Sequence, residues 1–446
     1  MRKLGFAVIG IILVAVIYYF TTGSEQVTQE IKNQVNRELA TLEQNGFAIK
    51  ERNIQKSEEH FIISFDDPKK IVDFFASQGA QMNLEDATAL KGLRIGVDAK
   101  YLNDAYSALS LDIYPLNLPT GITELDMDKE DKLILEQLNK MLKKKDILVH
   151  VDFNKLLSSF KGYLKDIHET LQGENEVKFN IEGVTFAGDI DKGKISRLDQ
   201  KLKHMTFEAK DEAHAQFSEL TSHYKRTGPN SYDSTSGYSV KNIHLTGINE
   251  TSKVLVSIDD MSGDSITSIK NDLAQSSIKA TASKVKFETN GEKSLLKGIT
   301  FNFNIKNLDM LALKKLEDAD ANNEAEINRL VQELISKGIA MEIPILEIKK
   351  IEAEGKSMDG FSLTANIDVD KSLNLAALQT NPMAALNAVN TKTKMTLSSE
   401  LAALIAQQPR AMLLMMLIPS QEINGKKIYE VELKNGSLSI NGKSVL

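Results

Sequence analysis

The stretch that decides the fold class is residues 299–305, which read ITFNFNI, together with residues 361–369, which read FSLTANIDV. Apolar and polar residues alternate strictly in both. Because successive side chains of a β-strand point to opposite faces, this period of two predicts strands with one apolar and one polar face, as in antiparallel sheets. Shorter runs of a similar kind lie at 62–65, 93–99, 109–113, 177–181, 243–245, 254–258 and 285–287.

Helical segments interrupt the predicted strands, so the expected class is α+β and β-rich, an elongated body of antiparallel, twisted sheet with interspersed helices. The predicted helix 307–337 has acidic residues in its middle and is expected to break near Asn322. The predicted helices are 129–145, 153–172, 307–337, 373–389 and 398–407.

A joint of one kind recurs between predicted strands and helices. The strand ends in Asp, Asn or Ser, and a segment of helical periodicity follows at once. Such a side chain accepts hydrogen bonds from the first free N–H groups of a helix, which explains its place. Repeated use of one joint and a duplicated domain are both open interpretations. The residues at the joints are Asp67, Asp152, Asn307, Asp370 and Ser398.

The end of the chain predicts a β-hairpin. Residues 428–433 alternate, Asn435-Gly436 follows, and residues 437–440 alternate again. Asn-Gly favours a two-residue hairpin turn because both residues tolerate positive φ.

The N-terminus predicts a membrane anchor. Arg2 and Lys3 precede an uncharged, mostly apolar run from Leu4 to Phe20, and with the next three residues the segment approaches the ~30 Å hydrocarbon core of a bilayer. The basic tip keeps the N-terminus in the cytoplasm by the positive-inside rule. We therefore expect residues 1–23 to be a cytoplasmic tip and a transmembrane signal anchor, with a cleaved signal peptide as the alternative.

The remaining chain is expected to divide into three parts. Residues 24–45 predict an amphipathic juxtamembrane helix, followed by β-rich regions at 46–230 and 231–446. The stretch 224–238 is rich in Gly, Ser and Tyr, which indicates a linker or an exposed recognition loop. The Met-rich run 411–418 is expected to be a buried helix turn or strand, or else an adaptable binding surface.

Composition excludes several kinds of chemistry. The chain has 446 residues with no Cys, so disulfides, thiolate metal sites and a cysteine nucleophile are excluded. Its formal charge of −7 offers no electrostatic basis for nucleic-acid binding. With 6% aromatic residues and no Trp, it lacks the aromatic platforms that sugar-binding clefts usually need.

No pattern predicts catalytic, cofactor-binding or metal-binding residues. The seven histidines include no HExxH pair. The segment that begins at Asp318 resembles a calcium-binding loop, but Asn323 stands where that loop needs Gly and Arg329 where it needs Glu. Gly-rich phosphate-binding motifs are absent from the sequence. We therefore predict no cofactor and no enzyme activity, with an envelope hydrolase as the least favoured alternative.

The chain resembles the YdgA-like family of bacterial proteins of unknown function. The resemblance rests on the basic anchor, the alternating strands, and residues 343–348 and 361–368. It also rests on a closing pattern with Tyr429, Leu433, Gly436, Leu438 and Ile440-Asn441-Gly442-Lys443. The chain departs from the family at 407–410 and in the Met-rich run. The resemblance implies an inner-membrane-anchored periplasmic protein and transfers no residue roles.

These expectations combine into a functional hypothesis. The protein is expected in the bacterial inner membrane, single-pass through residues 4–23, with most of the chain in the periplasm. Its expected role is non-enzymatic binding or scaffolding, through self-association or an envelope protein partner. The alternative is binding or transfer of lipid acyl chains along an open β-groove.

Overall fold

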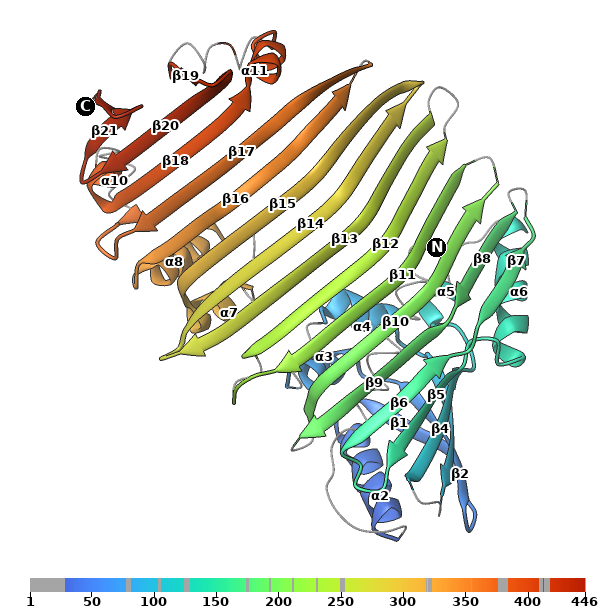
Figure 1. Ribbon diagram of the computed structural model, residues 1–446. Coiled ribbons are helices and arrows are strands. Elements are labelled where there is room, and N and C mark those ends of the chain that lie inside the picture. Colours follow the sequence, from blue (N-terminus) through green and yellow to red (C-terminus); the bar gives the residue numbers. More distant parts are fainter. Residues whose placement is uncertain are drawn as a thin grey trace. The chain divides into compact units, whose positions relative to one another are not determined.

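The structure is a computed structural model in two compact units, shown in Figure 1. Unit 1 ends at Lys225, and unit 2 comprises Arg226–Leu446. Residues 1–28, which contain the expected anchor, and most of the Met-rich run lie outside the described residues. The described chain is 29–445 without 78–81, 103–105, 124–128, 174–175, 192–193, 211, 230–231, 249–252, 318, 320–322, 354, 376–383, 409–411 and 413–417.

The β-rich α+β class is confirmed, with antiparallel pairing throughout the described ladders. Within the described part of the chain, no helix has both the length and the apolar character needed to cross a membrane.

Unit 1 combines a mixed-length antiparallel sheet with five described helices. The helices are α2 (Gln29–Gln44), α3 (Pro68–Ser77), α4 (Leu84–Ala89), α5 (Thr120–Thr123) and α6 (Lys129–Lys143). The strands are β1 (Phe47–Ile54), β2 (Glu58–Phe65), β3 (Arg94–Tyr101), β4 (Ser107–Pro115), β5 (Val149–Asn154), β6 (Ser159–Leu164), β7 (Ile167–Leu171), β8 (Val177–Glu182), β9 (Val184–Asp191), β10 (Lys194–Ala209) and β11 (Ala213–Arg226).

Helices cover one face of the unit 1 sheet. Strands β1 to β6 are sequential neighbours, and the ladder continues through β9 and β10 to β11. The β7–β8 hairpin pairs with the second half of β10. Leu39 of α2 and Ile71 of α3 are buried in one cluster with Phe61 and Leu111 of the strands. The side chains at the alternate positions of each strand point to the other face of the sheet, which is polar.

Unit 2 is a meander of long strands. Neighbours pair in sequence from β12 to β18, then β18 pairs with β20, and β20 with β19 and β21. The described strands are β12 (Ser234–Ile248), β13 (Lys253–Lys270), β14 (Leu273–Thr289), β15 (Glu292–Asp309), β16 (Ile339–Ala353), β17 (Lys356–Val369), β18 (Val389–Ser398), β19 (Gln421–Ile423), β20 (Lys426–Lys434), β21 (Ser437–Ile440) and β22 (Lys443–Ser444). The helices are α7 (Met310–Glu317), α8 (Glu324–Ile335), α10 (Ala384–Ala388) and α11 (Ser399–Ile405).

The long strands share one irregular row. Asp260 in β13 and Gly298 in β15 have left-handed backbone conformations, with φ of +49° and +64°. The registers place these residues and their neighbours directly opposite one another across six strands. The row, called the bend row below, consists of Lys241, Asp260, Ser283, Gly298, Lys349 and Gly360.

The apolar alternation changes phase at the bend row. In β13 the residues on the apolar face are even-numbered up to Ile258, as Val254 and Val256 are, and odd-numbered from Met261 to Ile269. The apolar side chains nevertheless face the same side on both sides of the row. Ile351 on one side and Phe361 on the other pack in the same cluster. The bend row therefore preserves one apolar face along strands of up to 18 residues.

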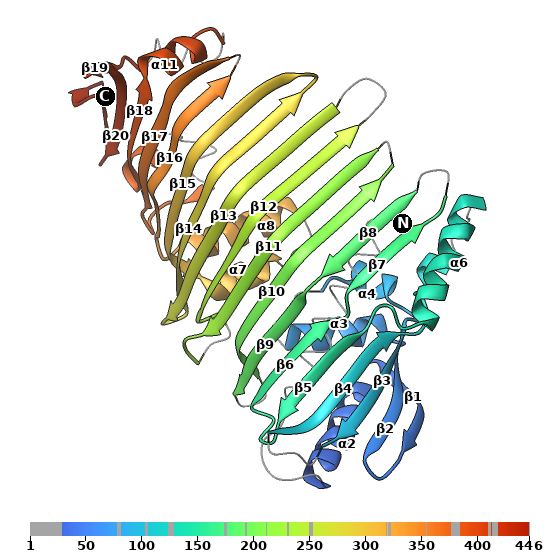
Figure 2. The same ribbon diagram turned by 45° about the vertical axis from the view of Figure 1, so that its right-hand side comes forward.

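Helices cover only parts of that face, as Figure 2 shows. One cluster joins Ile335 of α8 and Leu373 to strand residues such as Ile305 and Met341. A second cluster joins Leu401 of α11 to Leu397, Tyr429 and Phe361. Both helical covers therefore lie on the same face of the unit 2 sheet, at different places.

Several element predictions are confirmed. Helix α6 matches the predicted 129–145, and α7 with α8 reproduces the predicted helix that breaks in the middle. The C-terminal hairpin is present, and its turn has φ of +51° at Asn435 and +81° at Gly436. Pro68 opens α3, and the Ser398 side chain caps α11 by accepting from Leu401 N.

The helix predicted at 153–172 is wrong. The segment forms the end of β5, then β6 and β7. Its apolar residues are three or four apart because turns separate short strands, with Leu157 at a positive φ of +50° in the first turn. The joint predicted at Asp152 disappears with that helix, since Asp152 lies inside β5.

Two other joints differ in detail. At the Asn307 joint, α7 begins at Met310, and Asp309 rather than Asn307 accepts from the N–H groups of Leu311 and Ala312. At the Asp370 joint, Asp370 accepts from Ser372 N in a turn, and residues 371–374 are not helical.

Candidate functional site

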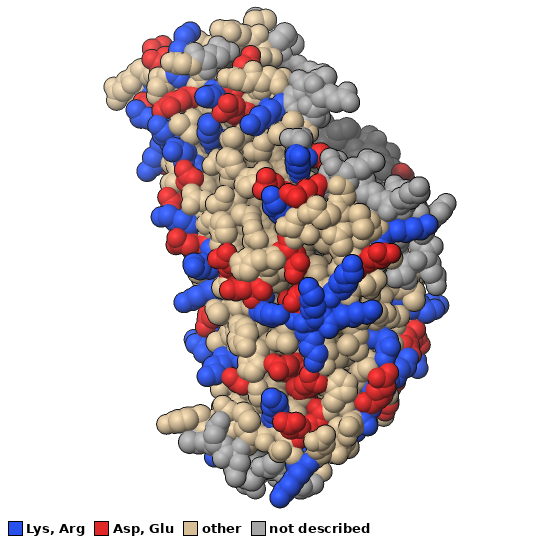
Figure 3. Space-filling view, turned by 90° about the vertical axis from the view of Figure 1, so that its right-hand side faces the viewer, with Lys and Arg blue, Asp and Glu red and all other residues tan. Residues whose placement is uncertain are grey.

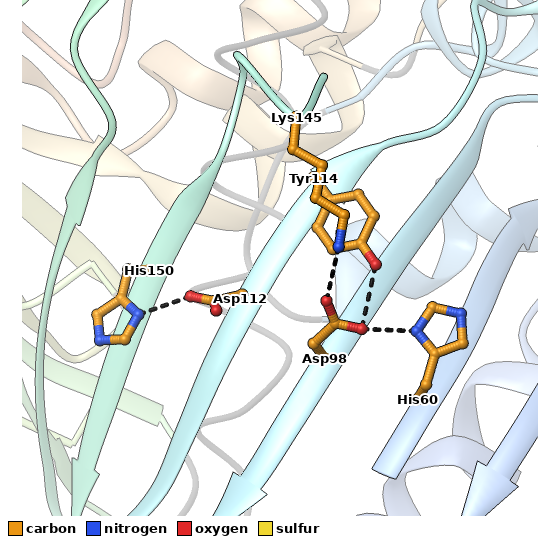
Figure 4. Close-up of polar contacts among 6 residues, drawn as sticks. All are labelled: His60, Asp98, Asp112, Tyr114, Lys145 and His150. Carbon is orange, nitrogen blue, oxygen red and sulfur yellow. Dashed lines mark hydrogen bonds and ion pairs between the residues drawn. The ribbon is translucent and has the colours of Figure 1, made fainter. Parts of the chain in front are cut away.

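The polar face of unit 1 carries one row of charged and imidazole side chains, drawn in Figure 4. The registers place His60 of β2, Asp98 of β3, Asp112 of β4 and His150 of β5 directly opposite one another. The two histidines lie at the ends of the four-residue row and the two carboxylates in its middle. Each histidine pairs with the nearer carboxylate.

Asp98 is the most heavily bonded member of the row. Its Oδ1 lies 2.6 Å from His60 Nδ1 and accepts from Tyr114 OH at 3.1 Å, and its Oδ2 accepts from Lys145 Nζ at 2.9 Å. Burial alone would raise the pKa of the Asp98 carboxyl, but the hydrogen bonds from Lys145, His60 and Tyr114 outweigh it and hold the pKa below its ordinary 3.8. The ammonium of Lys145 also lies 3.7 Å from the centre of the Tyr114 ring.

Close packing against Gly96 orients Tyr114. A Cβ at this glycine would lie 2.5 Å from Tyr114 Cε2. The ring therefore lies against the β3 backbone, with its hydroxyl directed to Asp98 and the Lys145 ammonium over its face (Figure 4). Burial raises the pKa of Tyr114, with the neighbouring Asp98 carboxylate adding to the effect, so its hydroxyl stays a donor.

His150 is held on three sides. Its Nδ1 lies 2.7 Å from Asp112 Oδ1, its Nε2 lies 3.3 Å from Asp152 Oδ1, and its ring stacks on Tyr163 at 5.0 Å. A pocket of about 240 Å³ next to the row is lined by His60, Asp98 and Asp112 among others. No three His, Asp or Glu side chains in the described ranges are arranged to hold a metal ion. The row is therefore a network of hydrogen bonds and ion pairs on the protein surface.

The second candidate is the apolar face of unit 2. Its residues form rows that run perpendicular to the strands, and the three main rows contain no charged side chain. Seven strands at about 4.8 Å spacing make the longest rows roughly 29 Å long. The three main rows are Tyr238–Gly263–Ala280–Phe301–Leu346–Leu363–Met395, Val240–Met261–Ala282–Ile299–Ile348–Phe361–Leu397 and Ile243–Ile258–Val285–Leu296–Ile351–Met358.

Much of this face is open to solvent. Tyr238, Leu245, Val254, Ile278 and Phe287 all lie on it and are between 38% and 43% exposed. They belong to strands β12, β13 and β14, away from the clusters that the helices form with β15 to β20. Exposed apolar side chains that gather on one sheet face are typical of an interaction site in a folded protein.

The opposite face of the same sheet is charged. Lys297 donates to Glu352 at 2.6 Å, and Lys392 lies 3.1 Å from Glu430. Figure 3 views the molecule from the right-hand side of Figure 1, and basic and acidic side chains are interspersed on that side as well. The two faces of the unit 2 sheet therefore differ sharply in chemistry, and the apolar one is the candidate functional site.

The tyrosine-rich stretch contributes to this site in a way that the sequence did not reveal. Tyr224 lies in β11 and Tyr238 in β12, so the loop between them is shorter than the predicted 224–238. The Tyr238 ring covers Gly263, where a Cβ would lie 2.7 Å from Tyr238 Cε1.

No site residue was expected from the sequence, although the alternation of residues 299–305 and 361–369 marks the apolar face. Alternation alone does not show whether other elements cover an apolar strand face. An apolar strand face is normally buried, and only the positions of the helices show that part of this face is open.

Comparison with known proteins assigns no family to this chain. No protein-family model matches it, and no curated protein is significantly similar to it.

Proposed function

We propose that this chain binds lipid acyl chains along the apolar face of unit 2. The observation that carries the proposal is the set of half-exposed apolar residues on β12 to β14, which continue the apolar rows beyond the helical covers. Burying such surface is favourable by about 25 cal/mol per Å². A bound acyl chain would bury these residues, which favours the complex and stabilises the folded sheet.

The chemistry of the rows favours an acyl chain over a protein partner. Protein interfaces carry roughly one hydrogen bond per 100–200 Å² and a polar rim. The three main rows offer aliphatic, Phe, Met and Tyr side chains and no charged group. The row from Tyr238 to Leu363 lies outside both helical clusters and crosses six strands, roughly 24 Å, which exceeds the length of one leaflet's acyl chains, about half of the ~30 Å hydrocarbon core.

The expected location agrees with this function. A signal anchor at residues 4–23 would hold the body beside the inner membrane, on its periplasmic side, where acyl chains are available. The role is binding and not catalysis. The YdgA-like resemblance remains a prediction and adds no residue role.

Site-specific photocrosslinking in cells tests the proposal. Benzoyl-phenylalanine replaces Phe303, which lies on the apolar face, in the full chain. Because this face would hold acyl chains, irradiation is expected to add lipid mass to the protein, measured by mass spectrometry after purification. The matched control places the same group at Asn302, the adjacent residue on the opposite face.

The control separates lipid binding from scaffolding. Lipid adducts at position 303 and none at 302 support the proposal. A crosslink from position 303 to a second protein chain, with no lipid adduct, would instead support the scaffolding role expected from the sequence. Absence of any adduct at 303 contradicts acyl-chain binding.

A further inference from the structure

The apolar face of unit 2 has a hydroxyl-bearing margin. Ser236 of β12 and Ser265 of β13 lie in the same row as Ile278 and Phe303. In the next row, Thr267 of β13 and Ser276 of β14 lie opposite each other and beside Ile305. The registers put all four hydroxyl side chains on the apolar face, directly beside its aromatic and aliphatic residues.

These hydroxyls are paired with each other. Ser236 Oγ and Ser265 Oγ are 2.9 Å apart, and Thr267 Oγ1 and Ser276 Oγ are 3.0 Å apart. In each pair one hydroxyl donates and the other accepts. The accepting hydroxyl therefore keeps its own O–H, which no hydrogen bond among the described residues uses. All four side chains are partly exposed, so each pair can donate one hydrogen bond to a ligand and accept others.

The absence of charged residues from the margin also limits the class of head group that can bind there. The two rows read Ser236–Ser265–Ile278–Phe303 and Ser234–Thr267–Ser276–Ile305–Met341, and neither contains an acidic or basic residue. An ionised carboxylate or phosphate placed here would lose water without gaining a counter-charge, which is costly. An ester or hydroxyl group loses less and regains its hydrogen bonds from the two pairs.

We propose that the ligand is an amphiphile with an uncharged, hydrogen-bonding head group. Its acyl chain lies along the apolar rows, and its ester or hydroxyl groups lie over the Ser236–Ser265 and Thr267–Ser276 pairs. This inference rests on the acyl-chain binding proposed above and adds the class of head group.

The test uses two photoreactive probes that share one acyl chain with a diazirine. One probe is a monoacylglycerol and the other is the free fatty acid. Each is titrated into membranes that contain the full chain, and labelling is quantified after irradiation. The test variant is the double substitution Thr267→Val and Ser276→Ala, which preserves shape closely and removes both hydroxyls.

The sheet offers a matched control pair on its opposite face. Ser262 and Thr281 belong to the same two strands, β13 and β14, and their hydroxyls are 2.9 Å apart. Their double substitution Ser262→Ala and Thr281→Val removes the same chemistry away from the proposed site. Equal cellular levels and thermal unfolding of the two double variants show that a loss of binding is not a loss of folding.

We expect the wild-type chain to bind the monoacylglycerol more tightly than the fatty acid. The test variant should weaken monoacylglycerol binding about fivefold, the effect of about one hydrogen bond, and leave fatty-acid binding unchanged. The control variant should bind both probes like the wild type.

The other outcomes overturn specific statements. If both probes label the apolar face but the test variant binds them like the wild type, the head-group inference is wrong and acyl-chain binding stands. The same holds if the fatty acid binds more tightly than the monoacylglycerol. If neither probe labels unit 2, acyl-chain binding itself is contradicted, and the head-group inference fails with it.

Discussion

Asp98 shows how one carboxylate can organise the polar face of unit 1. It accepts hydrogen bonds from Tyr114 and Lys145 and pairs with His60, and these contacts hold its pKa below 3.8 although burial acts in the opposite direction. A carboxyl whose pKa is lower in the folded than in the unfolded state stabilises the fold above the unfolded-state pKa. That contribution is lost as the pH falls through the folded-state pKa.

The substitution Asp98→Asn should therefore have a pH-dependent effect. At pH 7 it should destabilise unit 1 by about 1–2 kcal/mol, because Lys145 loses its partner at a partly exposed site. Below the unfolded-state pKa near 3.8 this contribution is lost progressively as the pH falls through the lower folded-state pKa, so the difference should shrink. Thermal unfolding measured by calorimetry at pH 7, 5 and 3 checks this, and a difference that stays constant over the three values would show that Asp98 acts by shape alone.

Residue contacts of this kind could not be predicted from the sequence. His60 and Asp98 are 38 positions apart, and so are Asp112 and His150. Each pair meets only because neighbouring strands adopt one particular register. Alternation predicts that strands exist and which side chains share a face, but it leaves the register open.

At the scale of elements, the bend row explains why the strands are longer than their sequence patterns. The run 254–258 predicts a short strand, whereas β13 extends from Lys253 to Lys270. The alternation breaks at Asp260 because the left-handed backbone there shifts the phase by one residue. A period-two pattern detects only one half of such a strand at a time, so β13, β14 and β15 were each predicted in part.

Gly298 tests whether backbone conformation maintains the bend row. A residue with a Cβ costs about 1–2 kcal/mol in the left-handed region, so Gly298→Ala should destabilise unit 2 by about that amount. The new Cβ would also lie 2.8 Å from Lys349 Cδ and 3.1 Å from Lys349 Cβ. Unfolding of unit 2, measured by calorimetry, gives the size of the effect.

Lys349→Ala supplies the control for this contact. If backbone strain dominates, the cost of Gly298→Ala should persist in the Lys349→Ala background. Full recovery in the double variant would show that crowding against the lysine, and not the φ angle, was responsible. Gly247 in β12 has no atom within 4 Å of its Cβ position and no positive φ, so Gly247→Ala should cost nothing comparable.

At the scale of the whole molecule, the two units differ in how they bury apolar residues. Unit 1 has one large core that joins helices to strands, including side chains such as Phe61, Phe65 and Leu111 that are almost fully buried. Unit 2 has two clusters of four buried residues each among its described residues, and much of its apolar face is half-exposed. The stability of unit 2 should therefore depend more strongly on what covers that face.

This difference predicts two thermal transitions in the full chain. A monoacylglycerol at about 100 times its dissociation constant should stabilise the folded unit 2 by roughly 2.7 kcal/mol, because it binds the folded sheet and not the unfolded strands. For a unit of about 220 residues this raises the unfolding temperature by roughly 5–10 °C. The unit 1 transition should not move, because its apolar side chains are already buried.

Calorimetry of the full chain with and without the probe measures both transitions at once. The Asp98→Asn substitution identifies the unit 1 transition, and Gly298→Ala identifies that of unit 2, because each lowers only its own. A ligand shift confined to the transition that Gly298→Ala lowers would locate binding on the apolar face. An equal shift of both transitions would mean that the lipid acts on the protein as a general solvent additive, and the open sheet face would then need another explanation.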